Sequence, residues 1–245
     1  MEKIRINKYL ANKGVASRRE IDRLIEEKLI KVNGNLATSG EKVSDEDEIE
    51  IRGVKLEKKT EKKVYFLLNK PLQVISASSD DRGRTTVVDL IDTDERIYPV
   101  GRLDYETEGA IILTNDGELF NKIIHPRTEV YKEYFATVKG FLEDSELKSL
   151  ESGVELEDGI TLPALVTLLN RDKNQSKVLI SIREGRNRRV RRMFDAVNHR
   201  VLKLKREKIG DIGIGNLKAG EYRKLNEREI AYLYSLGESE KTNLE

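Results

Sequence analysis

The segment RGVKLEKKTEKK, residues 52–63, constrains the fold most, because it offers almost no apolar side chain to bury. This composition is typical of a linker rather than of a helix or strand that packs in a core. It separates a small N-terminal unit from a larger C-terminal one, and each unit needs a hydrophobic core of its own. We therefore predict a domain over residues 1–52, a linker over 53–63, a second domain over 64–236 and a flexible tail over 237–245.

Composition excludes several classes of protein. Of the 245 residues, 38% are hydrophobic and 36% charged, while none is cysteine and two are histidine. Disulfides and zinc-thiolate sites are excluded, and a histidine-built metal site is not expected. The sequence shows no apolar run long enough for a transmembrane helix and no apolar export signal at its start. We expect a cytoplasmic monomer without a metal, a cofactor or a membrane partner.

The formal net charge of +1 hides two basic stretches. Residues 3–19 contain six basic residues and no acidic one, and residues 183–206 contain ten basic residues against Glu184 and Asp195. Acidic stretches such as SDEDEIEI, residues 44–51, lie between them. Solvated helix faces would explain one such stretch, but two in one chain favour a polyanionic partner, and nucleic acid in particular.

The N-terminal unit has the pattern of two helices and a small sheet. A first amphipathic helix ends near Gly14, and Ser17 followed by Glu20 is a capping box that opens the second. The Asn33-Gly34 pair predicts a tight hairpin turn. The side chains expected to bind the polyanion in this unit are Arg5, Lys8, Arg18 and Arg19.

The C-terminal unit alternates strand patterns with short helices. The expected strands are residues 64–71, 111–114, 131–140, 177–184 and 200–207. The expected helices are residues 119–124, 145–153, 190–197 and 226–233. This mixture predicts an α+β fold built on an antiparallel or mixed sheet.

Residues 99–117, PVGRLDYETEGAIILTNDG, place Asp104 just before an apolar strand pattern. Aspartate commonly forms turns, which is the simpler interpretation. However, Gly101, Gly109 and the Asn-Asp-Gly turn already provide the turns of this segment, so Asp104 is not needed to form one. The other interpretation is therefore a reaction centre. A glycosidase would need a second carboxylate across the scissile bond, and the nearest, Asp116, lies at the far end of the strand. If Asp104 is catalytic, it acts as a lone carboxylate.

Two further features carry candidate chemistry. The helix that follows EGRN has an apolar face from Val190 to Val197 and five arginines between residues 186 and 192, a density that suits phosphates. Tyr134 shares a strand face with Ala136, which favours a core position; the alternative is an aromatic platform for a nucleobase. The arginines of this helix expected to bind the polyanion are Arg186, Arg188, Arg189 and Arg192.

In chain order these segments resemble a known family. GRLDYETEGAIILTNDG resembles the signature of the pseudouridine synthases of the RsuA/RluB type, which isomerise uridine in bacterial ribosomal RNA. Four further segments resemble the family and occur along the chain in the family's order: FLLNKPLQVIS, DDRGRTTVVDL, IHPRTEVYKEYFATVKG and EGRNRRVRRMF. RINKYLANKGVASRREIDRLI and KVNG resemble its S4 RNA-binding domain. The resemblance covers residues 3–235, nearly the whole chain.

The resemblance implies roles for individual residues. Asp104 matches the catalytic aspartate, Tyr134 the tyrosine that packs on the target base, and Arg191 the residue that pairs with the aspartate. Arg102 is expected to meet the RNA strand, and Arg189 stands where the family has glutamine. The implied reaction breaks the N1–C1′ bond of uridine and rejoins the uracil through C5, without a metal or cofactor. The arginine-rich segment looks like the large-subunit, RluB-like branch, which implies 23S rRNA.

Three hypotheses remain open at this point. The first is a site-specific rRNA uridine isomerase with an S4 targeting module, acting on free RNA or on an assembly intermediate of the ribosome. The alternative is a non-catalytic S4-type RNA-binding or ribosome-assembly factor, in which Asp104 only forms a turn. A hydrolase of the glycosidic bond would instead release uracil and leave an abasic site. The residues leave open whether Asp104 attacks the sugar, attacks the base or removes a proton.

Overall fold

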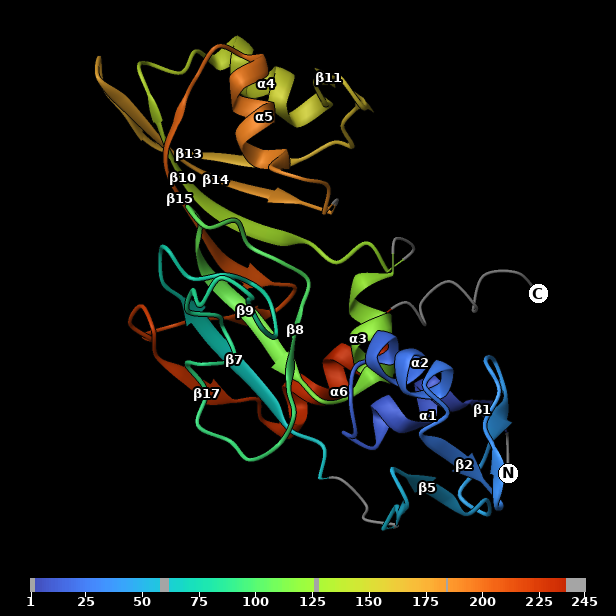
Figure 1. Cartoon of the computed structure of the whole chain (residues 1–245). Helices are drawn as coiled ribbons and strands as arrows, with labels where there is room; N and C mark the ends of the chain where they lie inside the picture. The colour runs from blue at the N-terminus through green and yellow to red at the C-terminus, as the bar shows by residue number, and fades with distance from the viewer. Residues whose placement is uncertain (1–2, 58–61, 126–127, 184, 237–245) are drawn as a thin grey trace, which may run out of the picture. The chain divides into compact units, whose positions relative to one another are not determined.

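The computed structural model describes residues 3–57, 62–125, 128–183 and 185–236. The chain divides into two compact units, each of which is described by itself (Figure 1). The first unit comprises residues 1–64, 93–96 and 115–117, and the second comprises residues 65–92, 97–114 and 118–245. The tail predicted over 237–245 lies outside the described residues.

The first unit packs two helices against short strands. The helices are α1 (Ile6–Asn12) and α2 (Arg18–Glu26). The strands are β1 (Ile4–Arg5), β2 (Ile30–Val32), β3 (Asn35–Leu36), β4 (Lys42–Val43), β5 (Ile49–Ile51) and β6 (Val54–Lys55). One sheet has the order β3-β2-β5-β6, and β1 pairs with β4. Ser17 caps α2 by accepting a hydrogen bond from Glu20 N at 3.1 Å, whereas the Glu20 carboxylate binds Arg23.

The start of the predicted linker, residues 53–63, forms a short strand, β6, in the structure. Arg52 and Gly53 both have positive φ, 53° and 80°, which forms a tight hairpin turn and returns the chain alongside β5 as β6. Leu56, just beyond, packs on the core of the first unit. Two apolar residues in a charged segment were too weak a signal to predict this strand.

The second unit is built on a nine-stranded sheet with the order β13-β14-β10-β15-β9-β7-β17, to which β16 and β8 are added. Its strands are β7 (Tyr65–Lys70), β8 (Tyr98–Val100), β9 (Glu108–Thr114), β10 (Lys132–Lys139), β13 (Leu165–Arg171), β14 (Gln175–Ile182), β15 (Val201–Ile209), β16 (Ile212–Gly213) and β17 (Tyr222–Lys224). Among the described residues, β15 and β9 are parallel and the other neighbours antiparallel. The predicted α+β fold with a mixed sheet is confirmed.

Helices and a separate hairpin cover this sheet. The helices are α3 (Gly117–Ile124), α4 (Asp144–Ser152), α5 (Arg189–Ala196) and α6 (Glu227–Ser235). Figure 1 shows α4 and α5 next to each other at the β13–β14 end of the sheet. Leu119 of α3 and Leu233 of α6 are buried in one apolar cluster with Ile112 of β9. The hairpin of β11 (Glu155–Leu156) and β12 (Gly159–Ile160) contacts α5.

The sequence analysis assigned no strand to β13. This strand lies at the edge of the sheet, and Leu165 and Leu169 on it are exposed. An apolar strand with little burial lacks the alternation that identifies strands. In the part of the chain that the structure describes, none of the helices has the length and apolar content needed to cross a bilayer.

The parallel contact between β9 and β15 requires a glycine. Gly109 lies opposite Arg206 and has φ +114°, a backbone conformation that side chains with a Cβ rarely adopt. A Cβ at this position would come within 2.5 Å of the backbone nitrogen of Arg206 and would also overlap its carbonyl group. Because backbone atoms of a central strand cannot move aside, the two strands pair here only through glycine.

We predict that Gly109→Ala lowers the free energy of unfolding by about 3 kcal/mol or more, since it adds a backbone clash to an unfavourable φ. Gly220→Ala is the matched control, because Gly220 has φ +89° but, among the described residues beyond its two chain neighbours, none has an atom within 4 Å of the point that its Cβ would occupy. The control should cost only about 1–2 kcal/mol. Urea denaturation measures both, and equal losses would contradict the steric account.

Candidate active site

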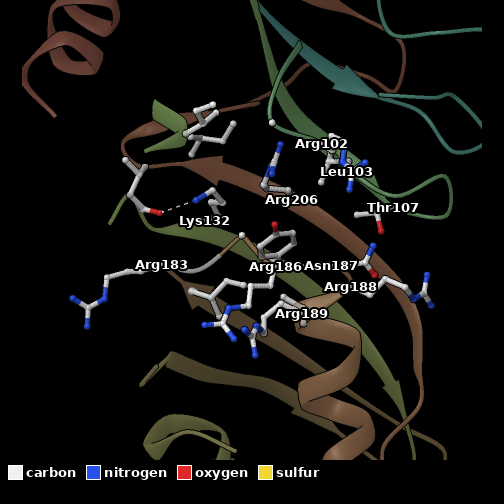
Figure 2. A pocket seen from close by; sticks show the side chains of 18 of the residues that line it. Arg102, Leu103, Thr107, Lys132, Arg183, Arg186, Asn187, Arg188, Arg189 and Arg206 are labelled. Atoms are coloured by element: carbon white, nitrogen blue, oxygen red, sulfur yellow. Dashed lines mark hydrogen bonds between the residues drawn. The ribbon is translucent and has the colours of Figure 1, made fainter. Parts of the chain in front are cut away.

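A cavity of about 740 Å³ opens in the second unit. It is lined by the turn before β9, by β10 and β15, and by the segment that joins β14 to α5. Figure 2 shows basic side chains around it, among them Arg102, Arg186, Arg188, Arg189 and Arg206. Asp104 and Tyr134 also line this cavity, so residues predicted separately from the sequence face one space.

Asp104 lies in the turn that leads into β9. Thr107 N donates a hydrogen bond to Asp104 O at 3.0 Å and closes this turn. Leu103 is fixed by the Ser76 hydroxyl, which accepts from Leu103 N and donates to Leu103 O. The Asp104 side chain is 34% exposed. Asp104 therefore both forms a turn and reaches the cavity, so the two interpretations of the sequence do not exclude each other.

Tyr134 is a core residue at the wall of the cavity. It is 8% exposed and shares its strand face with the fully buried Ala136 and Val138. A bulge between β10 and β15 places Tyr134 opposite Arg206 rather than Glu207. Bulges commonly redirect side chains beside functional sites, and this one sets a tyrosine and an arginine next to each other on the cavity face.

The expected pairing of Arg191 with Asp104 stays a prediction: the charge of Asp104 acts on Arg191, but the hydrogen bonds of Arg191 go to backbone carbonyls. Its guanidinium donates to Glu106 O at 2.8 Å and to Val201 O at 3.3 Å, below the turn that carries the aspartate. Burial, followed by the Arg188 cation, lowers the pKa of Arg191. Arg188 is the arginine whose Nη1 lies near Asp104, 4.0 Å from Oδ2. Arg188, just before α5, thus lies near the Asp104 carboxylate, whereas Arg191, one helical turn further along, is buried.

Three of the arginines predicted to bind RNA converge on Asp158, in the β11–β12 hairpin. Arg192 Nη2 lies 2.7 Å from Asp158 Oδ1, and Arg189 Nη2 lies 3.6 Å from Oδ2. Arg186 donates to the Asp158 carbonyl at 2.7 Å. The hydrogen bond from Arg192, followed by the charges of Arg189 and Arg192, lowers the pKa of Asp158 to about 2. No residue spacing in the sequence predicts this cluster of ion pairs.

The remaining predicted residues are at the surface. Arg5, Lys8, Arg18 and Arg19 are exposed on the first unit, at β1, α1 and the start of α2. Arg102 is exposed at the cavity. These positions allow contact with RNA, and their roles stay predictions.

Sequence reasoning missed three basic residues that lie under or beside the site. Lys70 is fully buried and donates to Thr107 O at 3.0 Å, and Arg206 is 3% exposed and donates to Ala110 O at 2.7 Å. Together with Arg191, three cations from three elements thus bind carbonyl groups of residues 106–110. Lys132 lines the cavity two residues before Tyr134 on the same strand face. A basic residue within an apolar strand, as at Lys70, was the signal that could have found them.

The cavity carries an excess of positive charge. Among the described residues that line it, seven are arginine or lysine and two are carboxylates. One carboxylate, Glu129, binds Arg183 at 2.6 Å, which leaves Asp104 as the other. Burial, and then Arg206, lowers the pKa of Lys132 to about 8. Such a cavity suits an anionic strand and presents one acidic group to it.

Comparison with known proteins identifies the class. The profile of the RNA pseudouridylate synthase family matches residues 64–196, and that of the S4 domain matches residues 4–49. The fold and these matches define an RNA-modifying isomerase. The chain belongs to the RNA pseudouridylate synthase family, and the resemblance on which the sequence analysis relied is confirmed.

Relatives match over nearly the whole chain. Ribosomal large subunit pseudouridine synthase B of Bacillus subtilis (strain 168) is 48% identical over 238 residues, covering 96% of this chain and 97% of that protein. Dual-specificity RNA pseudouridine synthase RluF of Escherichia coli O6:H1 is 34% identical over 239 residues, 96% of this chain and 80% of that protein. A crystal structure of a pseudouridylate synthase superimposes with a TM-score of 0.69 at 31% identity, covering 94% of this chain and 99% of that one.

We predict a pH dependence of stability that arises from Lys70. Burial lowers its pKa from the ordinary 10.5 to about 8, against the opposing effect of Asp104 and Glu108. Above pH 8 the folded protein releases this proton while the unfolded chain retains it, so the free energy of unfolding rises with pH. Lys70→Met should reduce this rise by about 2 kcal/mol between pH 8 and 9.5.

Urea denaturation across this pH range measures the effect. Lys148→Met, which replaces an exposed lysine of α4, is the control and should keep the wild-type rise. An equal rise in the wild type and in both variants would show that Lys70 titrates as an exposed lysine does.

Proposed function

We propose that this protein converts one specific uridine of ribosomal RNA, in the 23S molecule, to pseudouridine, with Asp104 as the catalytic carboxylate. The observation that carries the proposal is the position of Asp104, an acidic group in a cavity lined by Tyr134 and seven cations. The large-subunit name of the Bacillus subtilis relative, at 48% identity, supports 23S rRNA as the target.

The geometry suggests how the residues share the work. Chemistry on a stacked base requires that the nucleotide be extruded into a pocket, which the cavity provides. Tyr134 offers an aromatic surface for the uracil, and Arg102, at the cavity, offers a cation for the RNA strand. The N1–C1′ bond breaks, the uracil turns, and C5 bonds to C1′; C5 loses its proton and N1 gains one. No atom is gained or lost overall.

In this proposal, the turn that carries Asp104 is rigid. Lys70 and Arg191 donate to the carbonyls of Thr107 and Glu106, which fixes the backbone, while Arg188 lies 4.0 Å from the carboxylate. A preorganised carboxylate needs no rearrangement when the substrate arrives. In this proposal Arg191 acts on the turn and Arg188 acts directly on Asp104.

The N-terminal unit supplies RNA affinity in this proposal. Its S4 match, residues 4–49, includes the exposed side chains of Arg5, Lys8, Arg18 and Arg19. We assign residues 1–52 to RNA binding and residues 64–236 to catalysis, in a monomer that acts in the cytoplasm, where ribosomal RNA is made in bacteria.

We predict that Asp104→Asn keeps RNA affinity but lowers the rate of pseudouridine formation by at least about 10³-fold, because it removes the acidic group and leaves the shape unchanged. Primer extension on carbodiimide-treated 23S transcript maps the product. Glu106→Gln is the matched control: Glu106 lies two residues away, is 69% exposed and also faces Arg188, at 3.7 Å.

The control should stay within about 10-fold of the wild type, as expected for a group that does not react. Wild-type activity in Asp104→Asn would refute the catalytic assignment. A wild-type protein that binds the RNA but leaves it unmodified would favour the binding factor, and released uracil would favour a hydrolase.

A further inference from the structure

Asp158 holds the arginine-rich segment from outside the cavity. It lies in the turn between β11 and β12 and contacts three guanidinium groups of the segment 186–192. The shortest contact of its carboxylate is with Arg192, at 2.7 Å. Arg186 binds the Asp158 carbonyl at 2.7 Å and lies 3.5 Å from Oδ2. One aspartate thus meets arginines on both sides of Arg188.

Arg188 itself has an unfavourable backbone conformation. As the residue that precedes α5 it has φ 49° and ψ 29°, in the left-handed region. This conformation is unfavourable for a residue with a side chain. Such residues persist only where the surroundings fix them, and they concentrate at functional sites. Arg186 before it and Arg189 after it are both anchored to Asp158.

The left-handed residue points its side chain in a different direction from its neighbours. Figure 2 shows Arg188 directed away from Arg186 and Arg189. Its Nη1 lies 4.0 Å from Asp104 Oδ2 and 3.7 Å from Glu106 Oε2. The left-handed backbone of Arg188 thus separates its side chain from those of its neighbours. Arg186 and Arg189 contact Asp158, whereas Arg188 lies near Asp104.

We propose that Asp158 is a positioning residue: by binding Arg186, Arg189 and Arg192 it holds the strained Arg188 against Asp104, and it keeps Arg192 away from RNA phosphates. This inference rests on the proposed function, because it assigns a partner to the carboxylate of that site. Five arginines within seven residues repel one another, and a single shared carboxylate offsets part of that repulsion. Because the contacts with Arg192 and Arg189 lower the pKa of Asp158 to about 2, its carboxylate is charged at neutral pH.

The proposal predicts opposite effects on catalysis and on binding. Asp158→Asn should lower the single-turnover rate of pseudouridine formation by about 10-fold or more, since Arg188 is no longer held. RNA affinity should stay equal or increase, because a negative charge is lost and the Arg192 side chain is released. The slope of log K against log salt should steepen by about 0.7–0.9 for each arginine that turns to a phosphate.

A cycle with Arg188 separates positioning from general damage to the fold. If Asp158 acts through Arg188, adding Asp158→Asn to Arg188→Met should cost little beyond the single Arg188→Met change. Asp158→Glu keeps the charge and should recover part of the rate. Asp144→Asn removes the partner of Arg171, 2.7 Å away on α4, and should leave both rate and salt slope unchanged.

Arg192→Met provides a second test in case Asp158→Asn fails to fold. Arg192 is bound to Asp158 and does not appear among the described residues that line the cavity, so this variant should lower the rate and leave the salt slope unchanged. A shallower slope would place Arg192 on the RNA and overturn the proposal. A wild-type rate in Asp158→Asn, or losses that multiply in the double variant, would overturn it too. A wild type that makes no pseudouridine would refute the proposed function instead.

Discussion

The site depends on the close contact between two backbones at Gly109. Through this contact β9 and β15 pair in parallel, and β15 in turn pairs with β10. The turn before β9 carries Asp104, β15 carries Arg206 and β10 carries Tyr134. Three adjacent strands therefore bring an acid, a cation and an aromatic ring to one cavity, although these residues lie far apart in the sequence.

Buried cations fix the backbone beside the aspartate. Lys70, Arg191 and Arg206 come from β7, α5 and β15, and each donates to a carbonyl between residues 106 and 110. Burying a cation is costly unless its hydrogen bonds are made, so these side chains would not persist here without a benefit. The benefit that the geometry supports is a rigid, preorganised turn in a positive field.

The arginine-rich segment divides its residues between two tasks. Arg188 faces Asp104, whereas Arg186, Arg189 and Arg192 hold the β11–β12 hairpin through Asp158. A count of positive charges would assign all of them to RNA. Density of charge in a sequence therefore indicates a polyanion partner without indicating which side chains reach it.

The sequence predicted what local patterns encode. The helix predicted over 190–197 is α5, residues 189–196, and the strand predicted over 131–140 contains β10, because the apolar spacing fixes both. The missed strands include β6 and β13, which bury few apolar side chains, and also β1, β8, β11, β12, β16 and β17, which are only two or three residues long. The contacts of Arg191 with Glu106 and of Arg189 with Asp158 join residues far apart in the chain, and spacing carries no signal for such pairs.

The most direct test is the crystal structure of Asp104→Asn bound to a 23S rRNA fragment that contains the modified uridine. We expect a uridine rotated out of its helix, with the uracil against Tyr134 and C1′ beside the side chain at position 104. A target uridine that stays stacked in the RNA, or that binds outside this cavity, would refute the roles proposed for Asp104 and Tyr134.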